Sequence, residues 1–150
     1  MKVELIIDEE NTNDVITIKC NEYTSDIQRI HTWLQQFENK QKRIIGLNRG
    51  IEYYLELRHI AYFETDADVV FAHTLKKDFI IKQRLYELEK VLPNQFMRVS
   101  KSTILNLNYL YAIETTLGGP HRIDLQNTEK NVYVSRKYYP LLKEKLKERL

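Results

Sequence analysis

Residues 96 to 106 read Phe96-Met97-Arg98-Val99-Ser100-Lys101-Ser102-Thr103-Ile104-Leu105-Asn106, with a basic, hydroxyl-rich centre between two apolar stretches. A short helical run that Pro93 cannot continue precedes them. A second basic site, Val134-Ser135-Arg136-Lys137, follows after several turn-separated, β-rich segments. Cationic and hydroxyl side chains are the groups that bind phosphate oxygens and guanine edges. A β module with two such loops favours nucleic-acid binding over catalysis.

The composition is that of an ordinary soluble globular protein, with 150 residues, 43% hydrophobic and 29% charged. No run approaches the roughly 20 apolar residues needed to span a bilayer. Cys20 is the single cysteine, so no internal disulfide can form, which fits a reducing compartment. We therefore expect a cytoplasmic protein.

Net charge is only +2, but it is unevenly distributed. Residues 1–60 carry 8 lysines and arginines against 10 acids, whereas residues 61–150 carry 15 against 11. The basic excess thus lies in the half that contains both basic loops, as DNA binding requires. An open alternative is that this excess only solubilises a terminal helix through Lys143, Lys145, Lys147 and Arg149.

Periodicity predicts many short strands and three helices. The expected strands cover Val3–Asp8, Val15–Cys20, Ile44–Asn48, Ile51–Leu57, Ile60–Thr65, Val69–Thr74, Phe79–Lys82, Phe96–Val99, Leu110–Thr115, Arg122–Gln126 and Val132–Val134. Leu85, Leu88 and Leu92 indicate a short helix, and Ser135 is placed to cap a C-terminal one.

The N-terminal part contains a segment with helical spacing of apolar residues, unlike the closely spaced strands that follow. Ser25 and Gln28 fit a capping box at a helix start. Apolar residues then recur at helical spacing, at Ile27, Ile30, Leu34 and Phe37. With its flanking strands this helix predicts an N-terminal β-α-β extension over residues 1–55 and a β-rich domain over residues 56–150.

Catalytic and metal-binding signatures are missing from the sequence. There is no phosphate-cradling Gly-rich loop, no His-Glu-x-x-His and no Gly-x-Ser-x-Gly, and the four histidines are scattered. Asp66 and Asp68 could form a paired-carboxylate site, but two acids in a solvated turn explain them more simply. We expect no enzyme activity, no cofactor, no metal and no small-molecule substrate. Only about 55 residues precede the β module, too few for a receiver domain.

Four segments together resemble the LytTR DNA-binding domain of bacterial transcription regulators. They are His59-Ile60-Ala61-Tyr62-Phe63-Glu64, the run from Arg84 to Pro93, residues 96–106, and Tyr133-Val134-Ser135-Arg136-Lys137-Tyr138. The resemblance implies an α+β, mostly β fold of packed antiparallel sheets with short helices, here with the N-terminal extension added. It also implies that loops, and not a recognition helix, enter successive major grooves of DNA.

Carried over by position, the resemblance assigns three loops to DNA. They are Thr65–Val69, Arg98–Thr103 with Lys101 as the principal contact, and Ser135–Lys137 with Arg136 as the base reader. The DNA-binding candidates are Asp68, Arg98, Ser100, Lys101, Ser102, Arg136 and Lys137.

Two departures from the family pattern and several structural alternatives stay open. Many relatives have His where this chain has Ser100, and the first loop is acidic, although acids can accept from cytosine. Arg98 could instead pack the aliphatic part of its side chain over the sheet or pair with Glu87 or Glu89. Asn106 is interpreted as a structural residue of the turn, and Ser102 has the same alternative.

The sequence thus predicts a bacterial, sequence-specific transcription regulator that binds paired half-sites of double-stranded DNA as a homodimer. The extension would serve dimerisation or partner docking, and small regulators of this form resemble ones that act beside a membrane-protein partner. The alternative is a protein-interaction module that sequesters a partner and no longer binds DNA. The presence of both Lys101 and Arg136 argues against that alternative.

Overall fold

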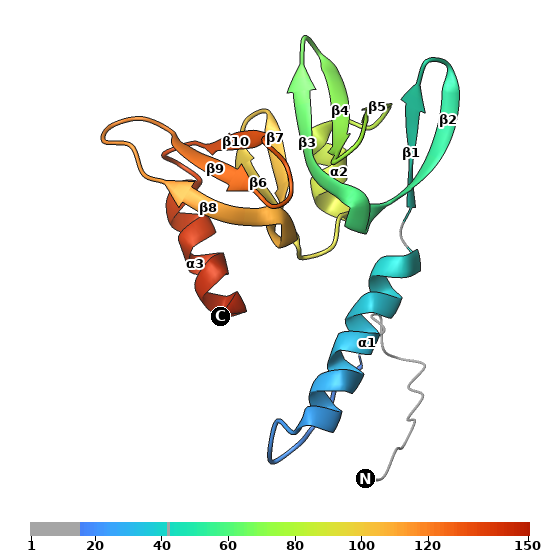
Figure 1. Cartoon of the computed structure of the whole chain (residues 1–150), viewed down its shortest axis with the longest axis vertical. Helices are drawn as coiled ribbons and strands as arrows, with labels where there is room; N and C mark the ends of the chain where they lie inside the picture. Colours follow the sequence, from blue (N-terminus) through green and yellow to red (C-terminus); the bar gives the residue numbers. More distant parts are fainter. Residues whose placement is uncertain (1–15, 42) are drawn as a thin grey trace. The chain divides into compact units, whose positions relative to one another are not determined.

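The structure is a computed structural model that describes residues 16–41 and 43–150 (Figure 1). The chain divides between Leu34 and Gln35 into two compact units. Helix α1 (Ser25–Gln41) begins in the first unit. Its start is capped by Thr24, whose hydroxyl accepts from the Ile27 N–H at 3.4 Å. The cap is therefore one residue earlier than the capping box predicted at Ser25.

The predicted β-α-β extension is only partly observed. Residues 16–20 have no regular secondary structure, so the strand expected over Val15–Cys20 is wrong for these residues. The Ile16 side chain is 74% exposed, and no described strand pairs with this segment to bury it. The strand expected over Val3–Asp8 lies outside the described residues. Helix α1 continues beyond Phe37 because the polar residues that follow include neither Gly nor Pro.

Seven antiparallel strands form the larger sheet, in the order β2-β1-β5-β4-β3-β7-β6. Their bounds are β1 Arg43–Asn48, β2 Ile51–Glu56, β3 Ile60–Asp66, β4 Val69–Thr74, β5 Asp78–Ile81, β6 Phe96–Ser100 and β7 Thr103–Asn106. Short connections join most neighbours in this sheet, so its pairing is largely that of successive hairpins. Two single-turn 3₁₀ helices, η1 Leu57–His59 and η2 Leu107–Tyr109, follow β2 and β7.

A second, three-stranded antiparallel sheet has the order β10-β9-β8. Its strands are β8 Leu110–Glu114, β9 His121–Leu125 and β10 Asn131–Val134. Helix α2 (Leu85–Val91) connects β5 to β6, and α3 (Tyr139–Arg149) follows β10. This architecture confirms the predicted α+β, mostly β class.

Two hydrophobic cores lie on opposite faces of the larger sheet. One buries the leucine face of α2, including Leu88 at 0% exposure, against the sheet. The other fills the space between the two sheets and also buries Leu142 of α3. Ile60 and Phe63 of β3 share the first core although they are three residues apart. In a regular strand, residues three apart point to opposite faces of the sheet. A register shift between Ile60 and Tyr62 inserts one extra residue, so both side chains point to the same face.

The β1–β2 hairpin belongs to the larger sheet. Leu47 of β1 pairs with Ile80 of β5, and Ile44 is buried in the α2 core. Gly46 lets β1 lie close to the side chains of Leu55 and Phe79. A Cβ at position 46 would lie 2.6 Å from Leu55 Cδ1 and 2.7 Å from Phe79 Cβ. Residues 43–55, predicted to belong to the extension, therefore contribute to the same sheet as the rest. The boundary predicted at residues 55 and 56 stays a prediction.

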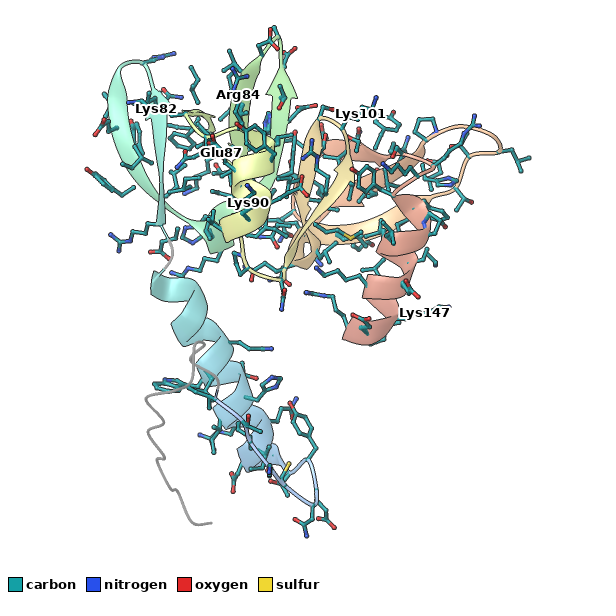
Figure 2. All side chains as sticks on the ribbon, turned by 180° about the vertical axis from the view of Figure 1, so that it is seen from behind. Lys82, Arg84, Glu87, Lys90, Lys101 and Lys147 are labelled. Atoms are coloured by element: carbon teal, nitrogen blue, oxygen red, sulfur yellow. The ribbon has the colours of Figure 1, made fainter. Side chains whose placement is uncertain are left out.

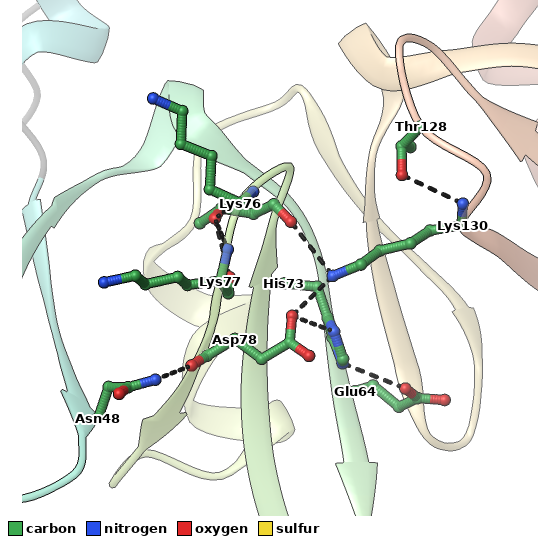
Figure 3. A network of polar contacts seen from close by, with 9 residues as sticks. Asn48, Glu64, His73, Lys76, Lys77, Asp78, Thr128 and Lys130 are labelled. Carbon is green, nitrogen blue, oxygen red and sulfur yellow. Dashed lines mark hydrogen bonds and ion pairs between the residues drawn. The ribbon is translucent and has the colours of Figure 1, made fainter.

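Polar contacts also join the two sheets (Figure 3). Lys130, in the turn before β10, donates to Asp78 Oδ1 at 2.7 Å and to the Thr74 carbonyl at 3.2 Å. His73 lies between two carboxylates, with Nδ1 2.9 Å from Asp78 Oδ1 and Nε2 3.3 Å from Glu64 Oε2. These are ion-pair distances, and neither ring nitrogen makes a well-aligned hydrogen bond. The network ties β3, β4 and β5 to the second sheet.

Candidate nucleic-acid interface

Backbone hydrogen bonds bring the three predicted DNA loops together. The N–H of Thr65, at the end of β3, donates to the Ser102 carbonyl at 2.8 Å. The N–H of Ser135 donates to the Val99 carbonyl of β6 at 2.9 Å. The segment Arg98–Thr103 is therefore bonded to the first loop through its turn and to the third loop through strand β6. Loops from three separate parts of the chain are therefore neighbours in the fold.

The first loop is a tight hairpin turn at Ala67 and Asp68. Their φ angles are +45° and +66°, and Asp66 pairs with Val69 across the turn. Two consecutive residues with positive φ are what a two-residue hairpin turn needs, and Asp tolerates this conformation better than most residues. The Asp68 carbonyl accepts from Arg84 Nη1 at 3.3 Å, which fixes the turn to the residue before α2. The Asp68 side chain is exposed.

The second loop is the β6–β7 turn, which Lys101 and Ser102 form. Ser100 Oγ accepts from the Ser102 N–H at 3.2 Å, and the two serine hydroxyls are 3.4 Å apart. The Ser100 hydroxyl therefore bonds the backbone of the turn, and the Ser102 hydroxyl lies beside that of Ser100. The Lys101 side chain is exposed, and Figure 2 shows it at the same margin of the domain as Arg84.

Arg98 of β6 lies beneath this turn. Its Nε donates to the Ser100 carbonyl at 2.7 Å, and its Nη2 donates to the Lys101 carbonyl. Nη1 donates to Glu89 of α2, one of the two acids that the sequence proposed as partners. Only 18% of the Arg98 side chain is exposed. The guanidinium is thus engaged with the protein on all three of its nitrogens.

The third loop runs from Ser135 to Tyr138. The Ser135 carbonyl accepts from the N–H groups of Tyr138 at 3.1 Å and Tyr139 at 2.9 Å. Ser135 therefore closes a turn through its backbone, and the prediction that its side chain caps α3 is wrong, since that helix begins later, at Tyr139. Arg136 and Lys137 are exposed, and Lys137 Nζ lies 5.6 Å from the centre of the Tyr138 ring.

Asn106 is a structural residue, as predicted. Its side chain is fully buried. Nδ2 donates to the Ile60 carbonyl at 2.9 Å, and Oδ1 accepts from the Asn108 N–H at 3.1 Å. These bonds satisfy a carbonyl where the β3 register shifts and an N–H where η2 begins.

Arg84 contacts the first loop, and the sequence analysis did not select it as a site residue. Its partner, the Asp68 carbonyl, is 16 positions away and follows no local pattern. Among the described residues there is no group of three or more His, Cys, Asp or Glu side chains arranged to hold a metal. The helices described in the structure also include none that is long and apolar enough to cross a bilayer.

Comparison with known proteins gives consistent matches. The family model of the LytTr DNA-binding domain matches residues 52–147. An uncharacterized HTH-type transcriptional regulator of Staphylococcus aureus strain NCTC 8325 is 30% identical over 146 residues, covering 97% of this chain and 98% of the relative. A protein of the same description from the bovine strain RF122 is 31% identical over 149 residues, with the same coverage.

A solved LytTr DNA-binding domain from Bacillus cereus has the same fold, with a TM-score of 0.66 and 20% identity over 71% of this chain and 97% of that domain. In the described parts of the chain, strands separate each helix from the next, so these parts contain no helix-turn-helix. The family match covers most of the chain, including all three loops. It confirms the resemblance seen in the sequence, and the chain belongs to the LytTr DNA-binding domain family.

Proposed function

We propose that the protein is a bacterial transcription regulator that reads DNA sequence through the three joined loops. The observation that carries this proposal is the pair of backbone bonds from Thr65 to Ser102 and from Ser135 to Val99. They join the second of the three loops that the family resemblance assigns to DNA to each of the other two, which supports a shared DNA-binding role. The names of the Staphylococcus aureus relatives as transcriptional regulators support the same function.

The exposed cations of this surface suit a duplex ligand. Lys101 projects from the central turn, and Arg136 and Lys137 project from the third loop. A guanidinium can bond guanine O6 and N7 together in the major groove, whereas an ammonium binds a phosphate as a point charge. We assign base reading to Arg136, and a contact with either phosphate or base to Lys101. Ser100 and Ser102 would offer hydroxyls to phosphate, and Asp68 would accept from cytosine.

The assembly follows from the same proposal. Two copies would bind half-sites about one or two helical turns apart. Residues 1–55 would serve dimerisation or docking of a partner, with a membrane protein as a candidate. Since bacterial chromosomal DNA lies in the cytoplasm, the regulator would act there.

Gel-shift titration with DNA from upstream of the protein's own gene tests the proposal. We expect a shifted complex that competes poorly with scrambled DNA and weakens steeply as salt rises. A matched titration with Arg136→Ala shows whether the shift depends on the proposed surface. Absence of any sequence-dependent complex would refute the proposal and favour a module that sequesters a protein partner without binding DNA.

A further inference from the structure

The guanidinium of Arg98 is bonded to two successive backbone carbonyls, those of Ser100 and Lys101, where β6 enters the β6–β7 turn. Arg98 donates from Nε to Ser100 and from Nη2 to Lys101, and Glu89 of α2 holds Nη1. A register shift between Arg98 and Ser100 interrupts the β6–β7 ladder at this point. Carbonyls beside such an interruption lose regular strand partners and need other donors. The planar, five-donor guanidinium can serve several acceptors at fixed angles, which an ammonium cannot.

We propose that Arg98 is a positioning residue, locked by Glu89, that sets the shape of the β6–β7 turn and thereby aims Lys101 at DNA. This inference rests on the proposed function. It gives Arg98 the structural role that the sequence left open, in place of the direct DNA contact that the resemblance implied. Glu89, which lies outside all three loops, becomes part of the DNA-binding machinery.

The burial and charge of the pair favour this role. The Arg98 side chain is 18% exposed and that of Glu89 is 43% exposed, so the guanidinium is covered while its acid partner meets solvent. The carboxylate also offsets the charge that Arg98 would need to attract a phosphate. Lys101, by contrast, is exposed at the apex of the turn whose carbonyls Arg98 holds.

Glu89→Gln tests the proposal because two mechanisms predict opposite signs. Removing a negative charge near bound DNA strengthens binding through simple electrostatics. If Glu89 locks Arg98, the same change loosens the turn, and we expect operator affinity to fall about tenfold, the size of one lost specific contact. Glu144→Gln, at an exposed site on α3, removes the same charge elsewhere and is the matched control. Affinity equal to or above wild type in a folded Glu89→Gln protein would overturn the proposal.

A double-mutant cycle separates positioning from direct contact. If Arg98 acts through Lys101, Arg98→Gln should cost little further affinity in a Lys101→Ala background. Full additivity would instead assign Arg98 its own DNA contact. Arg98→Lys keeps the charge but cannot bond three acceptors in a plane, so we expect it to behave like Arg98→Gln. Wild-type affinity for Arg98→Lys would contradict the positioning role.

A protease assay without DNA tests the role of Glu89 and Arg98 separately from the proposed DNA-binding function. Trypsin cleaves after Lys101, and the locked turn should resist it. We expect Glu89→Gln to be cut there several times faster than wild type or Glu144→Gln, under conditions in which all three remain folded. Equal cleavage rates would refute the lock, whether or not the protein binds DNA. Faster cleavage together with no DNA complex for wild type would retain the lock and refute the proposed function.

Discussion

Lys130 Nζ lies 2.7 Å from Asp78 Oδ1, and this ion pair connects the three-stranded sheet to β5 of the seven-stranded sheet (Figure 3). The two residues are 52 positions apart in the chain. Asp78 also lies 2.9 Å from His73 Nδ1. A single carboxylate therefore binds a lysine from the turn before β10 and lies beside a histidine of β4, and its ionisation affects how firmly the sheets are held together.

This arrangement predicts a contribution to acid stability. Partial burial by itself raises the pKa of Asp78, but the hydrogen bond and charge of Lys130 and the charge of His73 outweigh burial and lower the pKa below 3.8. A carboxyl whose pKa is lowered by folding stabilises the folded state above its unfolded pKa. That stabilisation is lost as pH falls through the lowered pKa of Asp78.

Asp78→Asn should therefore lower the free energy of unfolding near neutral pH. We expect about 0.5–1 kcal/mol, since Asp78 is partly exposed and solvent screens its pairs. Urea denaturation across the acid range should show the difference from wild type shrinking below about pH 4. Asp66→Asn, at an exposed site, is the control. A difference that stays constant with pH would mean that the ion pairs are not its source.

Leu88→Ala should destabilise the domain without altering its DNA chemistry. The side chain is fully buried between α2 and the larger sheet. Truncating a buried leucine costs about 2–5 kcal/mol of folding free energy. Thermal melting measures the loss, and Val91→Ala, at an exposed site on the same helix, is the control. Equal melting temperatures for Leu88→Ala and wild type would contradict the observed core.

Lys101→Ala should weaken DNA binding in one of two distinguishable ways. If Lys101 binds phosphate, affinity falls alike on all sequences and the salt slope decreases by about one unit. If it binds a base, the loss concentrates on the operator. Titrations on operator and scrambled DNA at several salt concentrations separate the two. A folded variant with neither effect would remove Lys101 from the interface.

Truncation tests where the DNA-binding domain begins. The β1–β2 hairpin pairs with β5 and buries Ile44, so a fragment of residues 43–150 should fold and bind one half-site. A fragment of residues 56–150 lacks that hairpin and should melt at a lower temperature. Equal melting temperatures for the two fragments would support the boundary predicted at residues 55 and 56. Binding of the full operator by residues 43–150 with wild-type affinity would exclude a role for residues 1–42 in assembly.

The features predictable from sequence are those set by local patterns. The leucine spacing around Leu88 predicted the buried face of α2. The positions of the three loops were predicted from the resemblance of four segments to the LytTR family. The strand expected over Val15–Cys20 failed because alternation alone does not supply a partner strand. The register shift near Ile60 and the bond from Arg84 to Asp68 depend on residues distant in sequence, which no local pattern reveals. For Arg98, the sequence left Glu87 and Glu89 open, and only the geometry selects Glu89.

Arg136 offers the most direct test of loop-based reading of the major groove. Dimethyl sulfate methylates guanine N7, which faces that groove, so a bound guanidinium protects it. With wild-type protein on its operator, we predict protected guanines in two half-sites. With Arg136→Ala, affinity should fall by about 1–3 kcal/mol, and one guanine in each half-site should regain reactivity while the others stay protected at saturating protein. A complex with no N7 protection, or a protection pattern unchanged by Arg136→Ala, would contradict this account.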